Sequence, residues 1–472
     1  MSATEAPRAS RALPLDAIRG GVAAIVVVLA VLLGGSSASS STPIASAAAG
    51  LVPEDALVFV HVSTDGARPA TKRAAELANR FPSWPAFRDS LVKRLSAPGC
   101  DAGTRALRTA KEAALALFDV GGGGTANSLV LIDTGRPHAR ATQTGCGTLS
   151  LQYVGHFLAI GQPESLKVAQ DLAAGKGRSL ADAPAPKQQV AQLPADRVVD
   201  GWVSQAGVRR LLAPQGGLLG AIGVLFDQPA LRGAAFALEP KGDGAHIVVR
   251  SVLDPATARR NTSGFKPFEP TLQDAVPARA MAYLGVSNVG PALKRVLAAA
   301  GAGSDQLGSI VGDLDPNLLK LFRGESAIVL LPAAPAPVLA LVAKTSDEAA
   351  TRQALAKLSP ALRRAFKTAV FDGKVVVATS QAGIDAIRNP GPKLTDTDEW
   401  RKATGDHPRQ VSSLVFLDFS RLLQLGEQTG LGASSAYQAY KRDLQQVHAI
   451  GAHTSGDDSE STAEISLSLS TP

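Results

Sequence analysis

Apolar runs and helical patterns alternate along the chain and predict a succession of short strands and helices. In the first half, residues 57–62, which are apolar except for His61, and residues 157–160 are short apolar runs typical of buried strands. Residues 163–173 begin with proline and are followed by Gly175, which predicts a helix with both ends marked. The pattern also predicts helices over 70–79, 84–95 and 105–118, strands over 129–133, 149–154 and 198–203, a loop over 183–194, and a hairpin over 234–253 that turns at 242–244.

The second half predicts a similar succession. Its strands are expected at 280–286, 326–331, 338–343, 369–371, 375–379, 412–417, 448–453 and 463–469, and its helices at 290–300, 346–358, 381–388 and 434–445. Short turns between neighbouring strands favour antiparallel pairing. The predicted fold class is therefore α+β, with mostly antiparallel sheet and helices on one face.

The order of motifs occurs twice, which indicates an internal duplication. Pro53 precedes an apolar strand as Pro277 does, and Trp202 precedes a helical pattern as Phe416 does. These pairs are separated by 224 and 214 residues, so the register drifts only by the length of a loop. We expect two tandem, homologous α+β domains that pack as a pseudo-symmetric pair, residues 51–254 and 275–470, joined by the linker 255–274.

The N-terminus has the pattern of an export segment. A basic tail, residues 1–19, contains Arg8, Arg11 and Arg19 and precedes an uninterrupted apolar run at 22–33. Residues 20–35 fit either a cleavable signal peptide or a single membrane anchor with its arginines inside. Residues 36–50 form a Ser/Ala-rich tether that contains Ala45-Ser46-Ala47, a small-residue sequence typical of signal cleavage sites. Either alternative, membrane anchoring or secretion after cleavage, places the bulk of the chain outside the cytoplasm.

Composition and charge narrow the classes of partner. The chain is 45% hydrophobic and 19% charged, which is enough to bury cores of ordinary domain size. Aromatic residues make up only 4%, which argues against an aromatic-lined sugar or nucleobase site. The net charge of +7 is scattered along the chain, whereas nucleic-acid binding concentrates it in a patch or motif. We expect the membrane, but no nucleic acid, among the partners.

The two cysteines of the chain, Cys100 and Cys146, fall in the first half. An even count in an exported chain favours a disulfide between them, and the alternative is two separately buried thiols. Their spacing does not suggest zinc binding or redox chemistry.

No residue pattern predicts a catalytic, cofactor-binding or metal-binding site. Ser90 and Lys93 lie one helical turn apart, as in penicillin-recognising enzymes, but the other motifs of those enzymes are missing. The seven histidines contain no pair at helical metal spacing. His448 and His453, five apart in a predicted strand, are expected to point to opposite faces.

One segment differs in character between the two halves. Residues 216–226 are uncharged and apolar, whereas their counterparts, 432–445, include Lys441, Arg442 and Asp443. The apolar segment predicts either a helix buried between the domains or a surface that meets lipid, a peptide or another envelope protein. Its candidate contact residues are Leu218, Leu219, Ile222, Leu225 and Phe226.

Three short motifs carry a resemblance to a known family. They are the opening Leu51-Val52-Pro53-Glu54-Asp55-Ala56, residues 314–319 running into 324–327, and the turn Asp372-Gly373-Lys374. With the export segment, they resemble the bacterial family described as DUF3352. The resemblance implies an exported, often membrane-anchored α+β protein and supplies no catalytic residue.

The sequence as a whole predicts a non-enzymatic binding or scaffolding protein of the cell envelope that acts through a groove between its halves. Two alternatives stay open. One is a hydrolase with an unrecognised serine or acidic site, and the other is a carrier of an apolar ligand in that groove.

Overall fold

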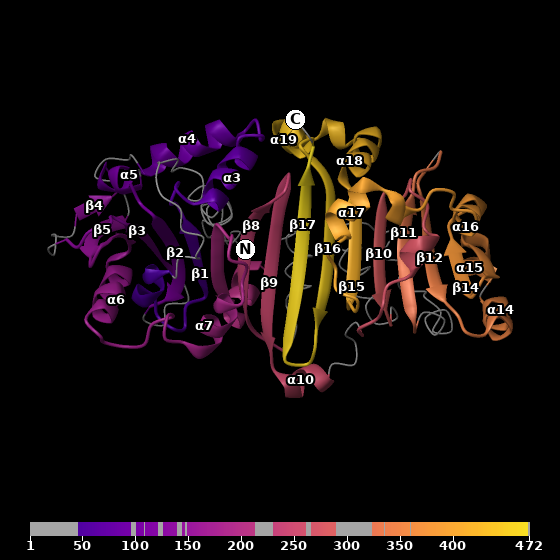
Figure 1. Ribbon diagram of the computed structural model, residues 1–472, viewed down its shortest axis with the longest axis horizontal. Coiled ribbons are helices and arrows are strands. Elements are labelled where there is room, and N and C mark those ends of the chain that lie inside the picture. The colour runs from indigo at the N-terminus through magenta and orange to yellow at the C-terminus, as the bar shows by residue number, and fades with distance from the viewer. Residues whose placement is uncertain are drawn as a thin grey trace, which may run out of the picture.

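The computed structural model contains one antiparallel sheet that runs along the long axis of the molecule (Figure 1). The structure describes residues 46–95, 101–107, 109–120, 126–138, 144–146, 149–212, 230–260, 266–288, 323–334, 336–358 and 360–470. The prediction of an α+β fold built on antiparallel strands is confirmed.

The N-terminal half contributes nine described strands. They are β1 (Val58–Ser63), β2 (Glu112–Asp119), β3 (Ala126–Asp133), β4 (Thr144–Cys146), β5 (Leu149–Val154), β6 (Phe157–Gly161), β7 (Val199–Ser204), β8 (Leu231–Lys241) and β9 (Gly244–Leu253). Their spatial order is β4-β5-β6-β3-β2-β1-β7-β8-β9.

The C-terminal half contributes eight. They are β10 (Ala282–Ser287), β11 (Glu325–Leu331), β12 (Val338–Lys344), β13 (Lys367–Phe371), β14 (Lys374–Ala378), β15 (Ser413–Asp418), β16 (Val447–Gly456) and β17 (Glu460–Leu469). Their spatial order is β13-β14-β12-β11-β10-β15-β16-β17, which repeats the pairing order β5-β6-β3-β2-β1-β7-β8-β9 of the N-terminal half.

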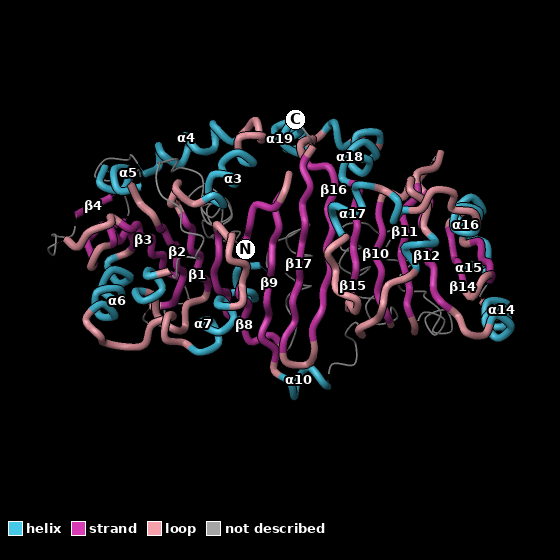
Figure 2. Tube along the Cα trace, in the orientation of Figure 1, coloured by secondary structure: helices cyan, strands magenta, loops and turns pink. Residues whose placement is uncertain are grey.

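The two halves meet where β9 pairs with β17, and we call this junction the seam. Pairing runs from Glu460 opposite Val252 to Ser468 opposite Gly244 without a break. Gly244 lies so close to the partner strand that a Cβ there would fall 1.7 Å from the carbonyl oxygen of Leu467. The halves are therefore joined edge to edge, and Figure 2 shows the strands as one continuous sheet.

Helices cover both faces of this sheet, so the prediction of helices on one face is wrong. The first face carries Phe59 and packs against α6 and α7, while the second carries Val58 and Val60 and packs against α3 and α5. The C-terminal half repeats this division, with α16 and α17 on the first face and α14 on the second. Strands buried on both faces lose the apolar–polar alternation that would have shown a single covered face.

The helices have the following bounds. They are α3 (Pro69–Ala78), α4 (Trp84–Leu95), α5 (Asp101–Leu107), α6 (Pro163–Ala173), α7 (Pro184–Ala191), α8 (Gln205–Gly207), α10 (Pro255–Arg260), α14 (Glu348–Ala356), α15 (Pro360–Ala365), α16 (Gln381–Arg388), α17 (Asp398–Thr404), α18 (Phe419–Gln428) and α19 (Ser435–Leu444). Shorter helices are η1 (Ala47–Leu51), η2 (Val208–Leu212), η3 (Leu272–Ala275), η4 (Leu394–Asp396) and η5 (Leu431–Ala433).

Two predicted elements of the N-terminal half are wrong. The helix expected over 105–118 is instead the end of α5 followed by strand β2, whose first seven residues are all buried. Its alanines and leucines satisfy helical spacing by chance because every position from Ala113 to Phe118 is apolar. The loop expected over 183–194 contains α7, which begins at a proline, the residue that fits the first turn of a helix.

Candidate functional site

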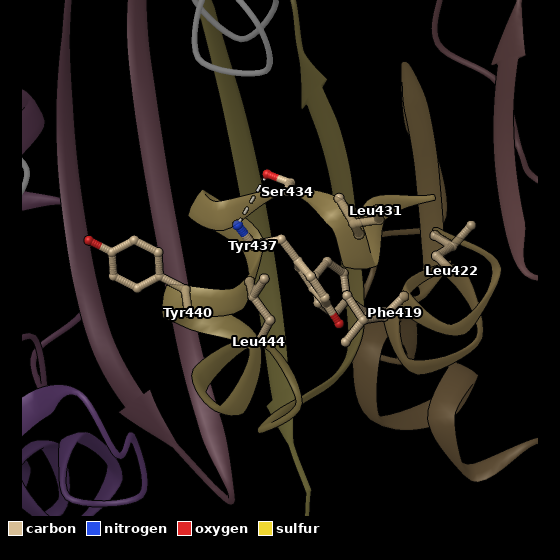
Figure 3. A pocket seen from close by; sticks show the side chains of 8 residues that line it. Phe419, Leu422, Leu431, Ser434, Tyr437, Tyr440 and Leu444 are labelled. Carbon is tan, nitrogen blue, oxygen red and sulfur yellow. Dashed lines mark hydrogen bonds between the residues drawn. The ribbon is translucent and has the colours of Figure 1, made fainter. Parts of the chain in front are cut away.

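An open apolar groove lies between α18 and α19 in the C-terminal half (Figure 3). Its volume is about 570 Å³, and its lining is apolar except for one serine and two tyrosine hydroxyls. The lining residues are Phe419, Leu422, Leu423, Leu431, Ser434, Tyr437, Tyr440 and Leu444. This groove lies within one half rather than between the halves.

Local capping sets the two walls of the groove. Asp418 accepts a hydrogen bond from the backbone N–H of Arg421 at 2.9 Å and starts α18, and Ser434 accepts one from Tyr437 at 3.3 Å and starts α19. Between them Gly430 adopts φ of 103°, the left-handed conformation that lets the chain reverse. The two helices therefore stand side by side with their apolar residues facing each other.

The groove is accessible to solvent, and both helices that form it are amphipathic. No residue of α18 is fully buried, Tyr440 is 59% exposed and Leu431 is 38% exposed. Tyr437 is buried, and its hydroxyl donates to Glu427, which also pairs with Lys441 at 3.0 Å. Burial and the Glu427 contact raise the pKa of Tyr437 to about 12, so its hydroxyl stays protonated. Contiguous exposed apolar surface of this kind is typical of interaction sites.

The apolar surface predicted from the sequence lies in the other half and stays a prediction. Residues 216–226, with the candidate contacts named above, lie outside the described residues. Their counterpart was set aside because of its charges, yet the groove is built there. The missed signal was the spacing of Tyr437, Tyr440 and Leu444 by three and four residues, which puts them on one helix face.

A buried charge cluster in the N-terminal half was not predicted from the sequence. Nδ1 of His61 lies 2.8 Å from Oδ1 of Asp200, and its Nε2 lies 3.7 Å from Oε1 of Glu112. Nε of Arg197 lies 3.2 Å from the same Asp200 oxygen. All four side chains are at most 7% exposed. We call these four residues the His61 cluster.

The charges in the His61 cluster compensate one another. Burial lowers the pKa of His61, but Asp200 and Glu112 outweigh it and raise that pKa above its ordinary value. Burial likewise opposes ionisation of Asp200, but His61 and Arg197 outweigh it and lower the pKa of Asp200. The cluster is therefore two cations balanced by two carboxylates, away from water.

In the C-terminal half, the positions that correspond to His61 and Asp200 are Gly285 and Leu414. His61 pairs with Asp200 where Gly285 pairs with Leu414, and Ser63 pairs with Glu112 where Ser287 pairs with Glu325. The glutamate is thus present in both halves, while the histidine and the aspartate are present in one.

The His61 cluster does not form the proton relay of a serine hydrolase. Such a relay needs a hydroxyl nucleophile at Nε2 of the histidine. Nε2 of His61 has no hydrogen-bond partner among the described residues and faces a carboxylate. Ser90, the other candidate, lies on the exposed face of α4 and donates to the carbonyl of Phe87 at 2.7 Å, and the side chain of Lys93 lies outside the description.

A second charge cluster crosses the seam on the first face. His246 of β9 contacts Glu239 of β8 through Nδ1 at 2.8 Å and Glu464 of β17 through Nε2 at 3.0 Å. Nε2 of His453 lies 3.9 Å from the same Glu464 carboxylate. Hydrogen bonds that His246 donates to Glu239 and Glu464 raise its pKa to about 9, whereas burial lowers the pKa of His453. A charged His246 thus ties the two halves together at neutral pH.

This linkage makes the seam sensitive to alkaline pH. Because the pKa of His246 is raised from 6.5 to about 9 on folding, its contribution is fully present below pH 6.5 and is lost as the pH rises through about 9. We expect this loss to be about 1.5–3 kcal/mol, the range for hydrogen bonds to charged groups. Urea unfolding at pH 6.5 and above pH 9 should show the loss in the wild type but not in His246→Gln. His156→Gln, at a half-exposed pair with Asp133, should keep the wild-type difference.

The remaining predictions about site residues have mixed outcomes. Cys100 lies outside the described residues, and Cys146 is placed in β4 without a described side chain, so the disulfide stays a prediction. His453 joins the seam cluster, while Nε2 of His448 lies 3.3 Å from Glu399. Within the described ranges, no group of three or more His, Cys, Asp or Glu side chains could hold a metal ion.

Membrane insertion is untested by the described helices. None of them is both long and apolar enough to cross a membrane, and residues 1–45 lie outside the description.

No family model, curated protein or solved structure matches the chain.

Proposed function

We propose that the protein is an extracytoplasmic binding protein, tethered to the membrane by residues 20–35, whose α18–α19 groove contacts the acyl region of an anionic bilayer. The groove carries this proposal because it is apolar, open and bordered by an exposed tyrosine. Tyrosine is enriched where a protein meets the membrane interface, since its ring is apolar and its hydroxyl polar.

The position of the tether supports the proposal. Helices α3, α4, α18 and α19 lie along one end of the strands (Figure 1). Strand β1 ends at Ser63, and the chain continues from there into α3. Glu112, the partner of Ser63, accepts a hydrogen bond from Ser46 at 2.5 Å, so the start of the described chain lies near this end of the strands. The ten residues 36–45 span at most about 36 Å even when extended. An anchored chain would hold this end of the strands close to the bilayer.

Charge around the groove supports an anionic surface as the partner. Arg421 and Arg442 are exposed on α18 and α19, the helices that form the groove, and Arg421 also pairs with Asp418 at 3.2 Å. The chain has a net charge of +7, so long-range attraction to anionic lipid acts in the same direction. Exposed arginines would contact headgroups while the leucines and tyrosines meet acyl chains.

The fold is also consistent with a duplication, which we include in the proposal. The two halves share the order of strand pairing, and Ser63 with Glu112 matches Ser287 with Glu325 in register. Two homologous α+β domains joined at β9 and β17 explain both features. Membership in the DUF3352 family stays a prediction.

The bilayer contact is tested by fluorescence quenching. Full-length protein carrying Tyr440→Trp would be reconstituted into phosphatidylglycerol-containing vesicles with bromine atoms on the acyl chains. The native indoles of Trp84, Trp202 and Trp400 are at most 6% exposed and should give a low, constant background. We expect the introduced indole to be quenched about twofold more than this background, because bromine quenches only on contact.

Leu339→Trp gives a matched control. Leu339 is 43% exposed but lies on β12, away from the groove, so an indole there should show background quenching only. Equal quenching at the two positions, or none at either, would refute the proposed contact.

A further inference from the structure

The start of the described chain is bound to the body by one carboxylate. Glu112 accepts hydrogen bonds from the hydroxyl of Ser46 at 2.5 Å, the N–H of Ala47 at 3.3 Å and the N–H of Ala48 at 3.1 Å. Ala48 is completely buried, and η1 packs against α6. The last residues of the tether are therefore folded into the body, with their N–H donors satisfied by a buried acid.

The C-terminal half binds its own entering segment in the same way. Glu325 accepts hydrogen bonds from the N–H of Thr271 at 2.6 Å, from its hydroxyl at 2.9 Å and from the N–H of Leu272 at 2.7 Å. The difference lies in the counter-charge. Lys344, which is 48% exposed, lies 2.9 Å from Glu325, whereas Glu112 faces the enclosed His61.

The enclosed histidine makes the N-terminal contact harder to open. His61 of β1 faces Glu112 through Nε2, and its Nδ1 contacts Asp200 of β7, which Arg197 also contacts. All four side chains are at most 7% exposed. Nε2 of His61 has no hydrogen-bond partner among the described residues although it is only 2% exposed. Its charge is thus directed at Glu112. Releasing Ser46–Ala48 would leave that carboxylate without its donors inside the body.

We propose that Glu112, with the other residues of the His61 cluster, keeps the last residues of the tether bound to the body and so protects the Ala47–Ala48 peptide bond from proteases. Proteases hydrolyse extended chain, adding water across the amide to leave a carboxylate on Ala47 and an amine on Ala48. Here this bond lies in η1, in a 3₁₀ helix that no protease cleft accepts without local unfolding. Ala45-Ser46-Ala47 has the small residues that such enzymes select, so the Glu112 contact would protect the body from being cut at this site. The inference depends on the tether and not on the groove.

The test is limited proteolysis of the full-length protein with elastase, which cleaves after small apolar residues. In the wild type we expect cleavage after Ala47 to be slow relative to cleavage in the preceding tether. Glu112→Gln should accelerate cleavage after Ala47 about tenfold, because the neutral amide is a weaker acceptor and leaves His61 without its second carboxylate. Ser46→Ala removes only the hydroxyl contact and should give a smaller increase. Intact mass and N-terminal sequencing identify the bond.

Glu325→Gln is the matched control, since it makes the same change at the corresponding position and should leave Ala47–Ala48 protected. Circular dichroism and the fragment pattern separate a local effect from unfolding, because an unfolded body would be digested throughout. The proposal is overturned if wild-type protein is cut after Ala47 as fast as in the preceding tether. It is also overturned if folded Glu112→Gln and Ser46→Ala proteins are cut no faster than the wild type.

Discussion

Asp200→Ala should lower the free energy of unfolding by about 3–5 kcal/mol, the cost of removing one partner from a buried charge network. Asp200 is the carboxylate shared by His61 and Arg197, at 2.8 and 3.2 Å. Without it, two buried cations face only Glu112, and His61 can escape this cost only by releasing its proton. Urea denaturation at neutral pH measures the change as a shift of the unfolding midpoint.

The control for this change is Asp196→Ala. Asp196 pairs with Arg73 at 3.0 Å, but the side chains are 56% and 41% exposed, so solvent screens the pair. We expect a loss of about 0–1 kcal/mol there. Similar losses for the two variants would contradict the description of the His61 cluster as a buried charge network.

Trp400→Ala should cost a comparable amount, about 3–5 kcal/mol, because it removes a large side chain from the core. Trp400 is 5% exposed and fixes α17 to the sheet through edge contact with Tyr283 and a tilted contact with Phe416, at ring-centre distances of 5.5 and 5.4 Å. The backbones of α17 and β16 are already so close that a Cβ on Gly451 would fall 1.9 Å from the carbonyl oxygen of Ala403. The helix therefore cannot move inward to fill the cavity.

Tyr440→Ala provides the comparison for the loss of a ring. Because Tyr440 is 59% exposed, we expect its removal to change stability by about 0.5 kcal/mol or less. Thermal unfolding of both variants would show the difference. A small effect at Trp400 would contradict the assignment of α17 to the core, whereas a large effect at Tyr440 would mean that the groove residues are structural.

The sequence predicted the strands better than the connections between them. Strand residues such as Val375–Ala378 are recognisable because apolar β-branched side chains follow a turn at Asp372, which adopts positive φ. The placement of helices on both faces could not be inferred, since strands buried on both sides show no alternation. The joining of the halves depends on β9 and β17 meeting in register, and no local pattern in either strand encodes its distant partner.

Most residues of the candidate sites could not be predicted from the sequence. Asp200 lies 139 positions from His61, and only the pairing of β1 with β7 brings them together. Neither residue stands in a motif, so each looks like a single polar residue in an apolar strand. The groove could have been found from the amphipathic pattern of α18 and α19. It was missed because charge was counted along the chain and not around the helix.

The continuous ladder at the seam has a consequence for how the molecule would sit on a bilayer. The tether enters through one half and the groove belongs to the other, so a flexible joint between them would let the groove swing freely. Nine consecutive paired positions in β9 and β17 leave no such joint. The orientation of the groove relative to the lipid would therefore be set by the rigid sheet that connects it to the tether.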